Sequence, residues 1–338
     1  KLRLLRWDLP AVDWSEQYKM SDVASKLDVF QRYIESKQAP RERSVVSRAV
    51  SVYRAVRARG HKNGDREAML AFMAVLNVAW THQDKKTSFT NHWLEAAEAG
   101  DAAQSLLGSI GIDMVVEQLL RPDMTNNKPP SIPLMLRHAS GRIFQEAHYL
   151  ALAPIQTDLF FDGQVKVAGP ASKALGAFFT PTPLVRTLAE QSLNRVDLKS
   201  KRIHVFDPAC GSGEFLREAV RQLELRGYKG QVKVTGYDIS PPACLMARFG
   251  LAAEAATFGG SLTINIEHRD ALDGQEWVSG VDVCLMNPPF VAWVDMTASQ
   301  RETVSRVLGE THVKRPDMAS AFVRLAVDSL FPSALIGA

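Results

Sequence analysis

The sequence predicts two parts: an all-helical N-terminal domain over residues 1–165 and an α/β domain with a mostly parallel sheet over residues 166–338. Two observations predict this division. Apolar residues recur at helical spacing from about Ser21 to about Leu152, whereas short β-rich runs alternate with helix-length stretches after about Lys166. Neighbouring parallel strands need a long crossover, usually a helix, so the second pattern is typical of α/β folds.

The composition indicates a globular protein and leaves the class of partner open. Of the 338 residues, 46% are hydrophobic, which is enough for sizeable cores in about two domains. A net charge of +3 permits binding to nucleic acid without requiring it. No apolar run reaches the roughly 18 residues of a membrane span, and the N-terminus lacks the features of a secretory signal.

The three cysteines, Cys210, Cys244 and Cys284, lie far apart and form no C-x-x-C pair. This spacing argues against a zinc site and against a disulfide framework. We therefore expect no bound metal and a location in the reducing cytoplasm.

The helical half contains two informative stretches. The segment REAMLAFMAVLNVAW, Arg66 to Trp80, has the apolar spacing of a helix. The arginines of RERSVVSRAVSVYRAVRARGHK, residues 41–62, are scattered around the helix axis. We therefore favour a solvated helix surface over a DNA-contacting one for this stretch.

Four strand candidates are separated by helix-length segments in the second half: RIHVFD, VKVTGYD, LTINIEH and VDVCLMN. In open α/β sheets, ligands bind outside the carboxyl ends of the strands. Each candidate ends at or just before a polar residue, so we expect four polar side chains to meet in one crevice: Asp207, Asp238, Asp270 and Asn287.

A glycine turn follows the first of these strands in FDPACGSGEFL, Phe206 to Leu216. The spacing Gly211-x-Gly213 between a strand and a helix lets the backbone approach a ligand that faces the helix N-terminus. Leu216 replaces the third glycine of G-x-G-x-x-G, so a pyrophosphate cofactor is disfavoured. The phosphate loop of helicase-like proteins is also missing from the sequence.

One acidic residue closes the second strand candidate, and another lies just beyond the third. Asp238, in GYDIS, can accept hydrogen bonds from both hydroxyls of a ribose, and Ile239 can pack on an adenine ring. Asp270, in HRDAL, is placed to receive an amino group of a cofactor. An isolated Asp is more often a turn former or a helix cap, but the combination of motifs favours binding here.

The last strand candidate stops on NPPF, Asn287 to Phe290. Two prolines cannot continue a sheet ladder and make the local backbone stiff. An amide side chain, a rigid carbonyl and an aromatic face can together hold a flat ligand that carries an amino group. The alternative is a purely structural Pro-Pro turn against which the Phe290 ring packs.

In this order and spacing, DPACGSGEFL, GYDIS, HRDAL and NPPF resemble the S-adenosylmethionine-dependent DNA adenine (N6) methyltransferases. The preceding GAFFTPTPLV, Gly176 to Val185, resembles the methionine-binding motif of that family. Its place ahead of the glycine turn is similar to the gamma subgroup, which includes modification subunits of restriction and phage-defence systems. The segment that starts at Arg315 resembles a helix over the active site that runs into a fifth strand. The resemblance therefore implies a Rossmann-like methyltransferase domain.

The resemblance also implies roles for individual residues. Asn287 and Pro288 would accept hydrogen bonds from the target amino group, and Phe290 would stack on the flipped base. S-adenosylmethionine would be held at its methionine end by Phe179, Thr180, Pro181, Asp207 and the turn with Ala209, Gly211 and Gly213, and at its nucleoside end by Asp238, Ile239, Asp270 and Ala271.

Other substrates and roles remain open at this point. Methyltransferases of protein glutamine and of RNA adenine use a similar Asn-Pro-Pro-aromatic turn, because they too methylate a planar amino group. A non-catalytic subunit of a defence complex would be favoured by a broken motif, and none is broken. The partners that the resemblance implies are DNA and specificity, nuclease or other defence-system subunits, with no membrane.

The last residues, LFPSALIGA, look like the start of a fifth strand. The sheet of the family that the sequence resembles has seven strands. We therefore expect a sheet truncated after its fifth strand, and a longer protein of which these residues are a fragment or the ordered part.

Overall fold

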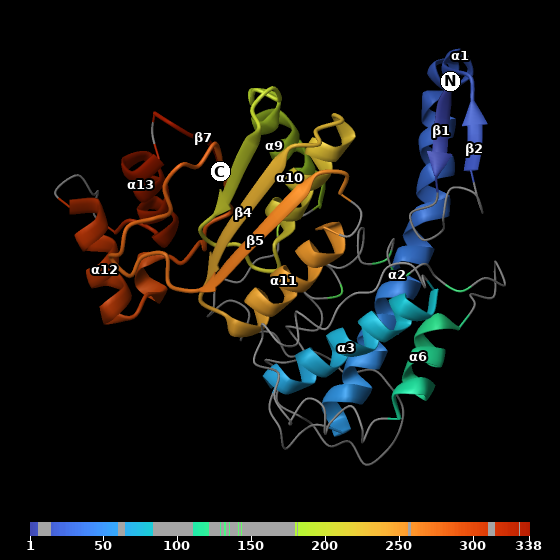
Figure 1. Cartoon of the computed structure of the whole chain (residues 1–338), viewed down its shortest axis with the longest axis horizontal. Helices are drawn as coiled ribbons and strands as arrows, with labels where there is room; N and C mark the ends of the chain where they lie inside the picture. The colour runs from blue at the N-terminus through green and yellow to red at the C-terminus, as the bar shows by residue number, and fades with distance from the viewer. Residues whose placement is uncertain are drawn as a thin grey trace. The chain divides into compact units, whose positions relative to one another are not determined.

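The computed structural model describes residues 1–5, 15–59, 65–83, 111–121, 129, 132, 135, 141, 143, 180, 182–255, 258–309, 315–330 and 332–338. The chain divides into two compact units, Lys1–Ala147 and His148–Ala338 (Figure 1). The predicted boundary between residues 165 and 166 lies outside the described residues, so it stays a prediction. In the described part of the chain, no helix is both long enough and apolar enough to cross a membrane.

The first unit is mainly helical, as the sequence predicts. Its helices with described bounds are α1 (Met20–Ser25), α2 (Leu27–Arg59), α3 (Asp65–Gln83) and α6 (Ile112–Leu120). They are preceded by an antiparallel pair that the sequence did not predict, β1 (Leu2–Leu5) and β2 (Ser15–Tyr18). Each of these strands has only four residues, which is too short for an alternating pattern to stand out.

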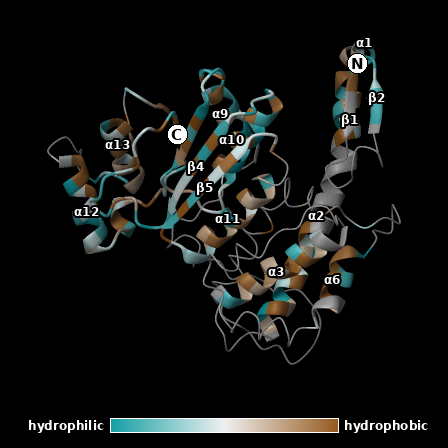
Figure 2. Ribbon diagram, viewed as in Figure 1, coloured by the Kyte–Doolittle hydropathy of each residue, from teal (hydrophilic) through white to brown (hydrophobic). Residues whose placement is uncertain are grey.

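The core of the first unit forms between α2 and α3. The Tyr53 ring of α2 meets the Phe72 ring of α3 edge to face, with centroids 5.4 Å apart. All side chains of α3 from Ala68 to Leu76 are buried, and hydrophobic residues follow one another along this helix (Figure 2). A helix that is apolar on all sides is expected to be a buried one.

The second unit is built on a five-stranded parallel sheet in the order β5-β4-β3-β6-β7. This confirms the predicted α/β fold. Three strands match the predicted runs almost residue for residue, and the last is the expected strand at the end of the chain. The bounds are Arg202–Asp207 for β3, Gln231–Asp238 for β4, Ser261–His268 for β5, Val283–Leu285 for β6 and Leu335–Gly337 for β7.

Strand β6 is shorter than the predicted run from Val281 to Asn287. Its ladder hydrogen bonds nevertheless extend beyond the strand. The N–H of Asp282 donates to the carbonyl of His204, and the N–H of Met286 donates to the carbonyl of Gly337, both at 2.9 Å. The two prolines that follow have no N–H to continue this pattern.

Side chains that alternate along the strands divide between two hydrophobic clusters, one on each face of the sheet. One cluster joins Ile203 and Val205 to helices α9 (Thr182–Leu193), α10 (Glu214–Leu225) and α11 (Pro241–Ala255). The other joins Phe206 to helices α12 (Ala298–Leu308) and α13 (Met318–Leu330). This is the three-layer arrangement of a parallel sheet, which must be covered on both faces.

The strand order creates a switch point between β3 and β6. From β3 the chain moves outward through β4 to β5, and it then returns to β6 on the other side of β3. Val205 and Phe206 of β3 pair with Val283 and Cys284 of β6. In open α/β sheets, a ligand binds at such a point, outside the carboxyl ends of the strands.

Candidate active site

The glycine turn leaves the carboxyl end of β3 on one side of the switch point. Gly211 and Gly213 both have positive φ, at 53° and 82°, which a glycine adopts at little cost. A Cβ at Gly213 would lie 3.1 Å from the Cβ of Ala247 on α11, so glycine permits the close packing of two helices there. A Cβ at Gly211 would have no atom within 4 Å, so this part of the turn faces open space.

Asp238 ties the glycine turn to the end of β4. Its Oδ2 accepts a hydrogen bond from the N–H of Gly211 at 2.9 Å. Its Oδ1 accepts one from the N–H of Ser240 at 2.8 Å. A carboxylate oxygen has two acceptor sites, so the carboxylate can hold the turn and still accept hydrogen bonds from a ligand. The neighbouring Ile239 side chain is 64% exposed.

Asp207, the last residue of β3, is almost fully buried. Burial raises the pKa of its carboxyl to about 8. The N–H of Ala209, which donates to Oδ1 at 3.0 Å, opposes this shift, and the negative charge of Asp238 adds to it. The carboxyl therefore holds a proton that an ordinary Asp would have lost at neutral pH.

Ser212 places a second buried polar group in the same turn. Its hydroxyl oxygen has no hydrogen-bond partner among the described residues, and its side chain is 1% exposed. Buried hydroxyls are normally paired, because an unpaired one costs free energy. Because this hydroxyl lies in a turn with an open face, a polar ligand could supply its missing hydrogen bond.

Asp270 lies in the loop after β5. Its Oδ1 accepts a hydrogen bond from the N–H of Leu272 at 2.9 Å. Its side chain is exposed, and its second oxygen accepts no hydrogen bond among the described residues. The next residue, Ala271, is buried, and its carbonyl accepts a hydrogen bond from the indole N–H of Trp277 at 2.8 Å. The loop is therefore fixed while one carboxylate oxygen stays available.

The Asn-Pro-Pro-Phe turn leaves β6 on the other side of the switch point. The side-chain N–H of Asn287 donates to the hydroxyl oxygen of Thr180 at 2.9 Å. This contact leaves the amide oxygen of Asn287 as an acceptor for another partner. Pro288 is buried, whereas Phe290 is 58% exposed. An exposed aromatic ring next to a fixed amide can receive a flat ligand.

In the structure, every described residue of the predicted site lies at or after the carboxyl end of a strand or, for Thr180, against Asn287. Phe179 and Pro181 lie outside the described residues. The roles of all these residues remain predictions. Within the described part, no three or more His, Cys, Asp or Glu side chains form a group that could hold a metal ion.

Sequence reasoning missed two features of the site. It assigned Thr180 to the cofactor and Asn287 to the target, but it did not foresee that the two side chains bond across 107 positions. It included Ser212 only as part of the turn from Ala209 to Gly213 and did not single it out, because a serine between two glycines carries no signal beyond that of a turn.

Comparison with known proteins shows which family the chain resembles. A family model described as N-6 DNA methylase matches residues 165–336. A type II methyltransferase, M.BanIII of Aneurinibacillus aneurinilyticus, is 27% identical over 177 residues, which cover 49% of this chain and 30% of that protein. The MjaIX methylase subunit, from a type I restriction enzyme of Methanocaldococcus jannaschii, is 31% identical over 116 residues, which cover 34% of this chain and 19% of that subunit.

This chain thus spans less than a third of the length of these two relatives. Among solved structures, a class I S-adenosylmethionine-dependent methyltransferase of Listeria monocytogenes aligns with a TM-score of 0.42 and 16% identity, over 86% of this chain and 71% of that one. The family match runs from before α9 to β7 and takes in half of the chain. The chain therefore belongs to the N-6 DNA methylase family.

Proposed function

We propose that this chain is the catalytic part of a DNA adenine methyltransferase. It would transfer a methyl group from S-adenosylmethionine to the exocyclic amino group of adenine in DNA, as part of a restriction-modification or phage-defence system. One observation carries the proposal. The amide of Asn287 is fixed by Thr180 beside the exposed ring of Phe290, across the switch point from the glycine turn.

The cofactor of N-6 DNA methylases is S-adenosylmethionine, whose sulfonium group supplies an electrophilic methyl. The described residues fit its nucleoside end. Asp238 has acceptor sites for two ribose hydroxyls, and exposed Ile239 offers an apolar surface for the adenine ring. The available oxygen of Asp270 can accept a hydrogen bond from the adenine amino group.

The glycine turn and Asp207 fit the methionine end. Gly211 leaves open space for close approach, and the unpaired hydroxyl of Ser212 can gain a partner from an amino or carboxylate group. The positive charge of an amino acid ammonium would favour the ionised form of Asp207, whose pKa burial has raised. Thr180 would also contact the methionine end of the cofactor, together with Phe179 and Pro181.

Asn287 and Pro288 would act on the target amine. The exocyclic amine of adenine is a poor nucleophile, because its lone pair is delocalised into the ring. The amide oxygen of Asn287 and the carbonyl of Pro288 can accept hydrogen bonds from its two N–H groups and draw the nitrogen toward a tetrahedral geometry, with its lone pair aimed at the methyl group. The C–N bond would form as the C–S bond breaks, S-adenosylhomocysteine would leave, and the methylated nitrogen would then lose one proton to water. Fixed acceptors and in-line positioning then supply most of the catalysis, without a covalent intermediate.

Phe290 would support a base that has left the duplex. Flipping a base costs a few kcal/mol, and stacking on an aromatic ring returns about 1–3 kcal/mol. The 58% exposure of the Phe290 side chain leaves a surface for this contact. The net free-energy cost of base flipping would therefore be lower with Phe290 than with a small residue at this position.

The setting of the reaction is part of the same proposal. The names of the relatives, among them methylase subunits of type I restriction enzymes, support partners such as a specificity or nuclease subunit. The thiols of Cys210, Cys244 and Cys284 are free and buried, which supports a reducing cytoplasm. RNA adenine and protein glutamine remain the alternative substrates, and a non-catalytic subunit remains the alternative role.

The test is transfer of a tritiated methyl group from S-adenosylmethionine to unmethylated genomic DNA, RNA and protein in parallel. The full-length protein with its subunits should label DNA at N6 of adenine, and Asn287→Ala in the same preparation should lose about 10²–10³ in rate. Cofactor affinity of that variant, measured by calorimetry, should stay within a few-fold. Label that appears in RNA or protein but not in DNA would overturn the choice of substrate, and lost cofactor binding would overturn the role of Asn287.

A further inference from the structure

We infer that Arg306, on helix α12, positions the loop that binds the adenine ring of the cofactor. The inference rests on the proposed function, because it assumes that Asp270 accepts a hydrogen bond from that ring. Arg306 follows the Asn-Pro-Pro-Phe turn, here called the target-binding turn, in the sequence. Among the described hydrogen bonds, none joins helix α12 to the glycine turn or to Asp238.

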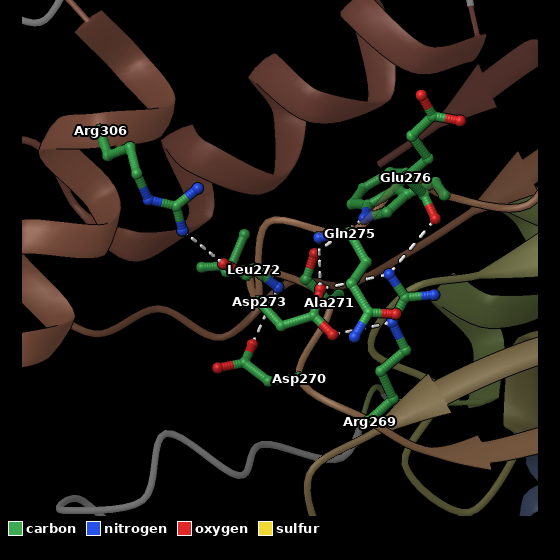
Figure 3. Close-up of polar contacts among 9 residues, drawn as sticks. Arg269, Asp270, Ala271, Leu272, Asp273, Gln275, Glu276 and Arg306 are labelled. Atoms are coloured by element: carbon green, nitrogen blue, oxygen red, sulfur yellow. Dashed lines mark hydrogen bonds and ion pairs between the residues drawn. The ribbon is translucent and has the colours of Figure 1, made fainter.

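The loop of residues 270–274 is held through both backbone groups of Leu272. The N–H of Leu272 donates to Oδ1 of Asp270 at 2.9 Å. The carbonyl of the same residue accepts a hydrogen bond from Nη2 of Arg306 at 2.9 Å. Figure 3 shows this chain of contacts from Arg306 through Leu272 to Asp270. A shift of Arg306 would therefore be passed on to the carboxylate of Asp270.

The guanidinium of Arg306 also packs against the loop. A Cβ added at Gly274, which has a φ of 87°, would lie 3.0 Å from Nη1 of Arg306. Leu272 is also buried in the same hydrophobic cluster as Val304 and Leu308 of α12. The loop thus has an apolar support and a polar one from the same helix.

The other polar supports of the loop come from its own flanks. The Arg269 guanidinium donates to both carboxylate oxygens of Asp273, at 3.1 and 3.2 Å, and to the carbonyl of Glu276 at 3.3 Å. The indole of Trp277 bonds to Ala271. Arg306 approaches from another side of the loop and is 34 positions away from Leu272 in sequence (Figure 3).

Helix α12 makes a matching contact with the segment after the target-binding turn. Arg301 donates from Nε to the carbonyl of Trp293 at 2.9 Å and from Nη2 to that of Val294 at 3.2 Å. One helix thus supports the adenine-binding loop through Arg306 and the segment behind Phe290 through Arg301. This gives a matched pair of arginines with different expected effects.

Because Arg306 is exposed, its positioning role can be tested separately from a role in stability. Its side chain is exposed, and its hydrogen bond among the described residues goes to the carbonyl of Leu272. Exposed polar contacts contribute little to the stability of a fold. Replacement of Arg306 should therefore leave the melting temperature nearly unchanged while it loosens the position of Asp270.

The test compares binding of S-adenosylhomocysteine with that of S-inosylhomocysteine, in which a carbonyl replaces the adenine amino group. Both are measured by calorimetry on the wild-type protein and on Arg306→Gln, Arg306→Lys and Arg301→Gln. The wild type should prefer the adenosyl compound by about tenfold, the worth of one hydrogen bond to a charged group. Arg306→Gln should reduce this preference to about threefold or less, whereas Arg306→Lys should restore part of it and Arg301→Gln should keep it.

Each other outcome has a distinct meaning. A wild type that binds neither compound would overturn the proposed function and this inference together. A wild type that discriminates, with Arg306→Gln discriminating equally well, would overturn the inference alone. Equal weakening of both compounds in Arg306→Gln, or a matching loss of preference in Arg301→Gln, would show general support of the fold and would also overturn the inference.

Discussion

The side-chain N–H of Asn287 donates to the hydroxyl oxygen of Thr180 at 2.9 Å. This bond fixes which end of the amide faces the site, because the nitrogen is engaged and the oxygen is left to accept. The predicted methionine-binding motif therefore also orients the predicted catalytic residue. The predicted cofactor and target sites would therefore share the Thr180 hydroxyl.

The first prediction follows from that hydroxyl. Thr180→Val keeps the shape of the side chain and removes the acceptor, so the Asn287 amide can rotate. We expect methyl transfer to slow by about 10- to 100-fold, because a small misplacement of a positioned group has effects of this size. Thr180→Ser keeps the hydroxyl and should stay close to wild type. Single-turnover kinetics on DNA would measure both, and equal rates for the two variants would contradict the orienting role.

The second prediction concerns the two roles of Asp238. Asp238→Ala should weaken cofactor binding by about 1.5–3 kcal/mol, the worth of hydrogen bonds to a charged group. It should also lower the free energy of unfolding of the cofactor-free protein, because the N–H groups of Gly211 and Ser240 lose their acceptor. Calorimetry and denaturant unfolding separate these effects. An unchanged cofactor affinity would place the ribose elsewhere.

The third prediction is a pH dependence caused by Asp207. Burial raises its pKa in the folded protein to about 8, from an ordinary value of 3.8. Between these values the folded protein keeps a proton that the unfolded chain has released. The contribution of Asp207 to the free energy of unfolding therefore falls as the pH rises from about 4, and it levels off above about 8.

Asp207→Asn removes this titration and keeps an oxygen for the N–H of Ala209. Without cofactor, the variant should gain stability relative to the wild type as the pH is raised from about 5 to about 8. Denaturant unfolding of both proteins over this range measures the difference. A difference that stays constant with pH would mean that Asp207 is ionised throughout.

The fourth prediction concerns a buried ion pair between α10 and α11. Arg217 donates from Nη2 to Glu254 at 3.3 Å, and the two side chains are only 4% and 3% exposed. Arg217→Met should destabilise the protein by about 3–5 kcal/mol, because it removes the positive charge that pairs with a buried carboxylate. Arg217→Met combined with Glu254→Leu should recover part of this loss.

Arg324 provides the control for that prediction. It pairs with Asp328 at 2.6 Å, but both side chains are almost half exposed, at 46% and 45%. Exposed pairs contribute about 0–1 kcal/mol, so Arg324→Met should be nearly neutral. Equal losses for the two variants in denaturant unfolding would show that burial of the Arg217–Glu254 pair has no energetic consequence.

The sequence by itself determined the position and type of the main elements of the α/β unit. The runs RIHVFD, VKVTGYD and LTINIEH became β3, β4 and β5, because β-branched and aromatic residues bounded by turn residues favour strands locally. It also determined that Asp207 and Asp238 end strands and that Asn287 follows one, and in a parallel sheet those ends must share one edge. The strands β1 and β2 escaped prediction because four residues carry too little pattern.

Only the tertiary structure decided how these residues act on one another. It set the strand order that puts β6 beside β3, the bond between Thr180 and Asn287, and the burial that raises the pKa of Asp207. It also brought Arg306 to the carbonyl of Leu272. The physical reason is that propensity and periodicity act over a few neighbouring residues, whereas hydrogen bonds and burial depend on which distant segments the packed core brings into contact.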